Sequence, residues 1–206
     1  MSPANPLLVP STLPYGLPDF SAIRDEHVMP ALEEALRRHT AEIAAIADSP
    51  EEPTAANTVV ALEQSGQDLA RVLGYFYTVA GADATEERLR MEAEISPLLA
   101  QHSDDMYMNP QLFHRIDAVF QTLPESVGSI EAKGGVTAAQ LEAETVALAQ
   151  RYHDLFLRHG AGLSAEAQAR VREINAELSQ LSSEFGDNLL KDTQARAVHI
   201  LSLIHI

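Results

Sequence analysis

Apolar residues recur at intervals of three and four along most of the chain after Pro18, which favours helices over strands. Leu32, Leu36, Ile43 and Ile46 begin this pattern, and it returns in segment after segment up to Phe185. Strand character is limited to residues 197–200, Ala-Val-His-Ile. We therefore expect an all-α fold, an antiparallel helical bundle whose helices are joined by short loops.

Capping and breaking residues indicate where the helices begin and end. Asn57 or Thr58 is expected to cap a single helix that carries apolar residues from Val59 to Phe76. Asp83 and Glu86 have the spacing of a capping box for the next helix. We expect Pro97 to kink that helix and Asn109-Pro110 to start the following one.

The second half of the chain follows the same rules. We expect a loop over residues 124–135 and a capping box over residues 137–140, before a helix that ends at Gly160. A last long helix begins near Ser164, and its apolar residues follow steps of 3, 4, 3 and 4. Such a seam predicts burial against a partner helix, with Leu178 at its centre. The seam consists of Val171, Ile174, Leu178, Leu181 and Phe185.

Five prolines in the first 18 residues exclude a continuous helix there, because each fixes φ and removes an amide donor. We interpret residues 1–18 as an extended arm that lies on another surface; a tail without contacts is the alternative. Residues 19–200 form the helical lobe. Residues 201–206, Leu-Ser-Leu-Ile-His-Ile, are interpreted as a non-native tail, since they are the translation of a common sequencing adapter. A genuine apolar strand is the alternative for that tail.

The formal net charge of −16 argues against binding to nucleic acid or to an anionic membrane. The chain contains no cysteine, which excludes disulfides, thiolate nucleophiles and cysteine-based metal sites. Neither a secretory signal nor a membrane span is visible. We therefore expect a cytoplasmic protein.

Histidines and carboxylates were considered as catalytic or metal-binding groups. Three pairs have the spacing of one helix face: His39/Glu42, His102/Asp105 and His114/Asp117. A zinc centre needs at least three protein ligands, so we interpret these pairs as solvated surface pairs. His153 and His159 are six residues apart and do not share a face.

Other patterns that could carry chemistry are weak. The chain has no Gly-x-Ser-x-Gly elbow, no phosphate-binding loop and only an isolated Gly134-Gly135 pair. Glu86/Glu87 and Glu142/Glu144 are interpreted as solvated carboxylates. The run Tyr75-Phe76-Tyr77 could line a ligand channel, although core packing is the preferred interpretation. From these residues alone we expect no catalytic, cofactor-binding or metal-binding residue in this chain.

Several segments, in order along the chain, resemble the start of the bacterial dipeptidyl carboxypeptidases, which are thimet oligopeptidase-like zinc metallopeptidases. The resemblance runs from about residue 5 to residue 200. The segments that carry it are Asn5-Pro6-Leu7-Leu8, Ser11-Thr12-Leu13-Pro14-Tyr15, Pro18-Asp19-Phe20-Ser21-Ala22-Ile23, residues 27–35 (HVMPALEEA), residues 57–66 (NTVVALEQSG), residues 106–113 (MYMNPQLF), residues 160–164 (GAGLS) and residues 185–190 (FGDNLL).

The resemblance implies a two-lobed helical peptidase that uses zinc to release C-terminal dipeptides from short peptides. It implies that this chain is an N-terminal portion, whose helices wall the substrate channel. The family's zinc helix, with its His-Glu-x-x-His motif, lies downstream and has no match here. We therefore expect the chain alone to bind no zinc, to be inactive and to lack its C-terminal catalytic lobe. Two alternatives remain open: a sibling oligopeptidase that cuts internally, and a complete non-enzymatic all-α interaction domain.

Overall fold

The computed structural model describes residues 5–123 and 138–197, and only the backbone of residues 138–142. The predicted all-α class is confirmed, since no strand is assigned in these ranges. The short 3₁₀ helices are η1 (Pro6–Leu8), η2 (Pro14–Gly16) and η3 (Asp25–His27), and η4 (Ala56–Val60) is a π-helical segment. The α-helices are α1 (Val28–Ala47), α2 (Ala61–Gln64), α3 (Gln67–Ala82), α4 (Glu86–Tyr107), α5 (Pro110–Gln121), α6 (Ala138–Arg158) and α7 (Ala165–Ala195).

Helix α1 contributes residues to two apolar clusters. Its first half packs with α3 and α4, where Leu32, Phe76 and Ile95 are fully buried. Its second half packs with η4, α2, α5 and α6, where Ile116 and Phe156 are fully buried. A helix that is needed by both clusters fixes them relative to each other.

The prediction of one helix from residue 57 to Phe76 is wrong, because the chain turns at Ser65-Gly66. Ser65 is extended and Gly66 has φ 71°, a left-handed conformation that favours glycine. Leu62 and Leu69 are seven residues apart, so the helical spacing continues across the break and conceals it. The short α2 and the longer α3 are the two sides of this break.

The helix ends follow local signals in most places. Asn109 caps α5, Ser164 caps α7 and Gly160 has φ 98° just after α6, as predicted. The capping box of Asp83 and Glu86 is wrong: Thr85 caps α4 by accepting from the Arg88 amide at 3.2 Å. Helix α4 continues through Pro97.

The arm is attached to the helices by its beginning. Asn5 caps η1, and its side-chain amide donates to the carbonyl of His27 at 2.8 Å, just before α1. Leu7 is 1% exposed and belongs to the first apolar cluster. Farther along, Val9, Leu13 and Leu17 are exposed, and the side chain of Tyr15 is 98% exposed. The contacts of the arm are therefore concentrated at Asn5 and Leu7.

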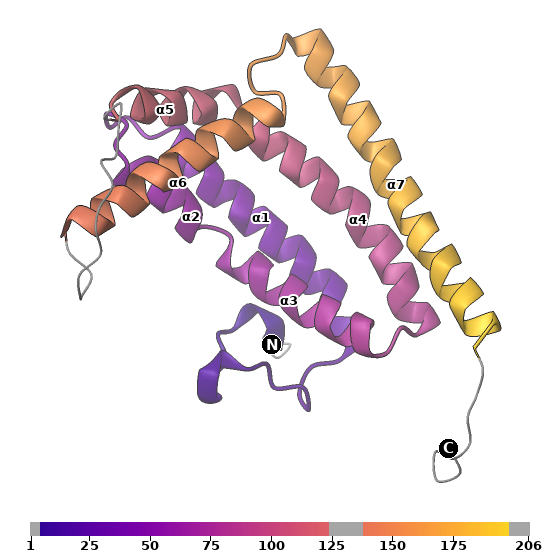
Figure 1. Cartoon of the computed structure of the whole chain (residues 1–206). Coiled ribbons are helices and arrows are strands. Elements are labelled where there is room, and N and C mark those ends of the chain that lie inside the picture. The colour runs from indigo at the N-terminus through magenta and orange to yellow at the C-terminus, as the bar shows by residue number, and fades with distance from the viewer. Residues whose placement is uncertain (1–4, 124–137, 198–206) are drawn as a thin grey trace, which may run out of the picture.

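The burial that the spacing suggests for the last helix's seam is not observed within the described residues. A truncated lobe is expected to lack the partner that would cover such a seam. Leu178 is 55% exposed and Phe185 69% exposed, although α7 lies along α4 in the opposite direction (Figure 1). Asn175 donates to the carboxylate of Asp104 at 2.7 Å, and Arg172 lies 3.7 Å from Asp105. These polar contacts turn the other face of α7 towards α4. The spacing of the seam specifies an apolar stripe but not the element that covers it.

Some expectations fall on residues outside the described ranges. They are the loop at 124–135, the capping box at 137–140, the Gly134-Gly135 pair, the strand character of 198–200 and the tail at 201–206. In the described part, every helix is too short or too polar to cross a membrane.

Candidate functional site

A histidine pair joins α1 and α4 at their contact with the α2–α3 turn. His102 Nε2 lies 2.9 Å from His39 Nδ1, and His39 Nε2 lies 3.1 Å from Ser65 Oγ. Ser65 Oγ donates to the carbonyl of Leu62 at 2.7 Å. Nearby, Glu42 accepts from the amide of Gly66 at 2.7 Å. Three separate helical segments are thus held by one chain of polar contacts.

The direction of these hydrogen bonds decides their chemistry. The Ser65 hydroxyl has one proton and donates it to Leu62, so we assign His39 Nε2 as a donor to Ser65 Oγ. A neutral His39 then accepts at Nδ1, and His102 Nε2 is the donor. A serine nucleophile needs a base that accepts its proton, whereas this imidazole donates. The cluster is therefore a structural joint.

Burial favours the neutral form of both imidazoles. Burial lowers the pKa of His39, and the charge of His102 lowers it further, against the opposing effect of Glu42. Burial also lowers the pKa of His102, against the opposing effect of Asp105. A pair in which both rings are protonated would place two donors, and no acceptor, at the 2.9 Å contact.

Two other histidines, His153 and His159, contact residues on neighbouring segments. Asp117 on α5 lies 3.2 Å from His153 Nε2 on α6, so it does not form the predicted pair with His114. The His153 ring stacks on Phe120 with centroids 3.9 Å apart. His159 stacks on Tyr107 at 4.1 Å. The interpretation of the histidine–carboxylate pairs as solvated is wrong for His39 and His102, because each is partly buried and bound to a residue from another helix.

The described residues do not fit a zinc centre. Within the described ranges, no three histidine or acidic side chains converge closely enough to hold a metal ion. His39 and His102 instead satisfy each other. No step of a metal-dependent reaction is therefore derived from this part of the chain, and the expectation that it holds no metal ligand stays a prediction.

The remaining candidates separate into core and surface residues. Tyr75 and Phe76 are buried at 4% and 0% exposure, which supports core packing, whereas Tyr77 is 42% exposed. Glu86 and Glu87 lie exposed in the first turn of α4. Glu144 is exposed, and the side chain of Glu142 lies outside the described residues. Glu86, Glu87 and Glu144 therefore lie at the surface.

Sequence reasoning missed Arg115, a buried cation that joins α5 to the loop after α1. It is 5% exposed, and Nη1 donates to the carbonyls of Ser49 and Glu51 at 3.0 and 2.8 Å. Nη2 donates to the side-chain oxygen of Asn57 at 3.1 Å. A usable signal was present, since Arg115 follows Leu112 by three residues and precedes Val119 by four, on the buried face of α5.

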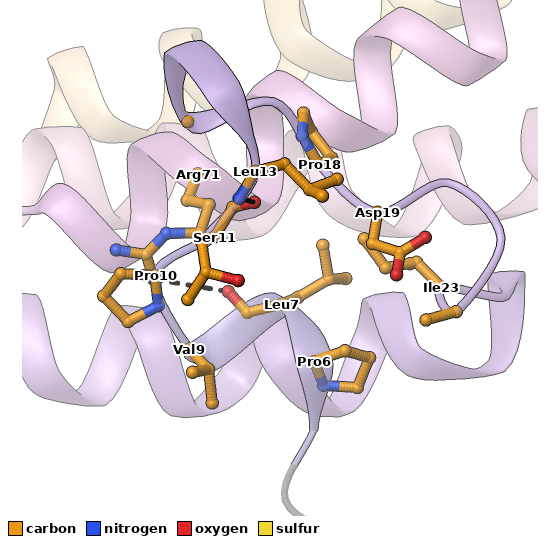
Figure 2. A pocket seen from close by; sticks show the side chains of 13 residues that line it. Pro6, Leu7, Val9, Pro10, Ser11, Leu13, Pro18, Asp19, Ile23 and Arg71 are labelled. Carbon is orange, nitrogen blue, oxygen red and sulfur yellow. Dashed lines mark hydrogen bonds between the residues drawn. The ribbon is translucent and has the colours of Figure 1, made fainter.

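A hollow of about 340 Å³ lies beneath the arm (Figure 2). Its walls are largely apolar and include Pro6, Leu7, Leu13 and Ile23. Arg71 lines it from α3, where it donates to the carbonyl of Leu7 at 3.4 Å and to Asp68 at 2.8 Å. Ser11 donates to the carbonyl of Leu17 at 2.5 Å, within the arm. The polar groups named here therefore hold the arm in place.

No family model matches the chain. The chain is 38% identical over 190 residues to the dipeptidyl carboxypeptidase of Escherichia coli K12, covering 92% of this chain and 26% of that protein. It is 38% identical over 191 residues to the dipeptidyl carboxypeptidase of Salmonella typhimurium, with 93% and 26% covered. Identity to the oligopeptidase A of Haemophilus influenzae is 28% over 193 residues, with 94% and 26% covered.

The resemblance to the thimet oligopeptidase-like peptidases is confirmed. The chain spans about a quarter of the length of the curated relatives that it matches. Its identity to the two dipeptidyl carboxypeptidases is ten percentage points higher than its identity to the Haemophilus oligopeptidase A.

The segments that carry the resemblance occupy structural joints. Asn5 attaches the arm to α1, Asn57 receives Arg115, and Asn109 caps α5. Gly66 packs closely against the ring of His39: a Cβ at position 66 would lie 3.1 Å from ring atoms. These residues fix how the helices of this chain meet.

Proposed function

We propose that this chain is the N-terminal portion of a cytoplasmic zinc metallopeptidase that releases C-terminal dipeptides from short peptides. The observation that carries the proposal is the 38% identity to dipeptidyl carboxypeptidase along 92% of the chain. Cleavage between internal residues, as in an oligopeptidase, is the second candidate. The lower identity of 28% to an oligopeptidase A makes it the less favoured of the two.

In this proposal the chain contributes a wall of the substrate channel, and the rest of the protein contributes the catalytic groups. Two features support a framework role. Helix α1 belongs to both apolar clusters, and the clearest polar contacts, those of His39, Arg115 and Asn5, connect segments of the lobe to one another. Zinc and the groups that hold it are assigned to the part of the protein that follows this chain.

Sequencing the gene from the source DNA tests the proposal first. We expect the reading frame to continue beyond about codon 200, without the codons for residues 201–206. Downstream it should encode a His-Glu-x-x-His motif within a helix, followed by a glutamate ligand. A stop codon directly after codon 206 would contradict the proposal and favour a complete, non-enzymatic interaction domain.

Activity measurements form the second test. The full-length protein should retain zinc through dialysis and release a dipeptide from an N-terminally blocked tripeptide. The 206-residue chain should do neither under the same conditions. Zinc retention together with dipeptide release by the short chain would place the catalytic groups within it and overturn the assignment.

A further inference from the structure

The apolar row on α7 faces away from the described lobe. We call it the α7 seam; it leaves out Val171 of the predicted seam and extends to Leu189. Its residues follow steps of four, three, four and four and share one stripe of the helix. Its members are 40, 55, 52, 69 and 57% exposed, in the order Ile174, Leu178, Leu181, Phe185 and Leu189. Contiguous exposed apolar surface of this kind is typical of an interaction site.

The face of α7 that does contact the lobe consists mostly of polar or small residues, with Leu190 as an apolar member. Asn175 bonds to Asp104, which is 5% exposed, and Arg172 lies near Asp105. Farther along, Ser183 and Gly186 line a hollow of about 340 Å³ shared with α3 and α4. Helix α7 is therefore held on α4 by its less apolar side, and none of its described residues is fully buried.

We propose that the α7 seam is the docking surface for the segment of the parent protein that follows this chain, a helix with an apolar face flanked by basic side chains. The proposal rests on the proposed function, since it requires a longer parent. The matched relatives are about four times as long as this chain, because it covers 26% of them. Consecutive helices joined by short loops pack side by side, so the helix after α7 is the nearest candidate to cover it.

Charge argues against a second copy of the chain as the occupant. Each chain has a formal net charge of −16. Glu177 and Glu184 are exposed and immediately precede Leu178 and Phe185. Two seams brought together would place these carboxylates in one interface, where like charges repel. A helix with lysine or arginine beside its apolar face would instead complement them.

Thiol labelling tests the proposal, because the chain has no cysteine of its own. Leu178→Cys places a thiol in the seam, and Gln180→Cys places a control thiol at an exposed position of the same helix. Both positions fall within one tryptic peptide, residues 173–191, so mass spectrometry reads them on the same fragment even if the parent has other cysteines. Each variant is made in the 206-residue chain and in the full-length protein, and its rate of reaction with a maleimide is measured.

We expect the two thiols to react at similar rates in the short chain. In the full-length protein, the thiol at 178 should react at least tenfold more slowly, while the thiol at 180 stays fast. Amide hydrogen exchange of residues 173–191 in the unsubstituted proteins provides a second measurement, and exchange should be slower in the full-length protein. This exchange measurement uses no substitution, so it tests the proposal even if Leu178→Cys disturbs folding.

Equal labelling at 178 and 180 in the full-length protein, without slower exchange, would overturn the docking proposal. Protection of 178 in the short chain would also overturn it: protection that grows with concentration would indicate a second copy, and protection at every concentration would indicate cover from the chain itself. Peptidase activity is measured separately. An active protein with an uncovered seam refutes only the docking, whereas a covered seam without dipeptide release refutes only the proposed function.

Discussion

Helices α1 and α7 are both long and both carry an apolar stripe, yet they have opposite fates in the structure. Helix α1 buries Val28, Ala31, Leu32, Ala35, Ile43, Ile46 and Ala47, and α7 buries none of its described residues. The difference lies in the neighbouring helices. Helix α1 packs against helices of both apolar clusters, whereas the main contact of α7 is with α4. A periodic stripe therefore shows which face of a helix prefers burial, and the surrounding elements decide whether burial occurs.

The largest effect is expected from truncating the α1 stripe. Leu32 is fully buried, so Leu32→Ala leaves a cavity and should reduce the free energy of unfolding by about 2–5 kcal/mol. Urea denaturation of the 206-residue chain, followed by circular dichroism, measures the change. A loss below about 1 kcal/mol would mean that α1 is not the rigid centre of the lobe and would remove the contrast with α7.

A smaller loss is expected from replacing Arg115, the buried arginine of α5 that bonds to the loop after α1. Arg115→Met keeps much of the side-chain volume but leaves the carbonyls of Ser49 and Glu51 without their donor. Unsatisfied buried groups cost about 1–3 kcal/mol, which is the expected destabilisation in the same denaturation assay. Arg170→Met is the matched control, because the Arg170 side chain is 68% exposed and its ion pair with Glu173 lies at the surface. Equal effects of the two substitutions would contradict the assigned role of Arg115.

Local signals made most helix ends predictable, because a cap depends on residues within one turn. Asn109, Gly160 and Ser164 act where the sequence places them. The break at Gly66 was missed because the apolar spacing runs through it. Both outcomes show that periodicity reports which residues share a face, whereas backbone continuity depends on single residues.

The polar joints were less predictable because their partners come from other helices. Spacing pairs His39 with Glu42 and His114 with Asp117, but the structure joins His39 to His102 and Asp117 to His153. Sequence separations of 63 and 36 residues lie beyond any helix-face argument. The exposure of the α7 seam was unpredictable for a related reason, because the contact between α7 and α4 joins residues far apart in the sequence, such as Asn175 and Asp104.

Acidification should reduce the free energy of unfolding of the chain, because it affects the His39–His102 contact between α1 and α4. In the folded chain the pKa values of His39 and His102 lie below the ordinary value of 6.5, so the folded state binds fewer protons than the unfolded state below that pH. The contribution of these groups to stability is therefore complete above about pH 6.5 and falls as the pH decreases towards their folded pKa values.

Denaturation midpoints of the wild-type chain and of His102→Gln, measured from pH 7.5 to 5.5, test this expectation. As the pH falls, the wild type should lose stability more steeply than the variant, because the variant lacks one of the two imidazoles that titrate. His27→Gln is a control, because the His27 ring lies outside the joint, where it accepts from the backbone amide of Arg24. A wild-type slope equal to that of His102→Gln would show that the joint does not couple folding to protons.

The smallest effect is expected on α7. Leu178 lies at the centre of the seam but is 55% exposed, so Leu178→Ala removes few contacts and creates no cavity. Alanine also has the higher helix propensity, by a few tenths of a kcal/mol, which offsets part of the lost contact. We expect a change below about 0.5 kcal/mol in the free energy of unfolding of the 206-residue chain.

The same substitution in the full-length protein sharpens the comparison. If the seam is covered there, Leu178→Ala should cost about 2–5 kcal/mol, as expected for Leu32→Ala, because the side chain is then part of a packed interface. The different burial of α1 and α7 in the short chain would then result only from the absence of the segment that covers α7. A cost of that size already in the 206-residue chain would show that the seam is packed without any further segment, and the distinction between α1 and α7 would fail.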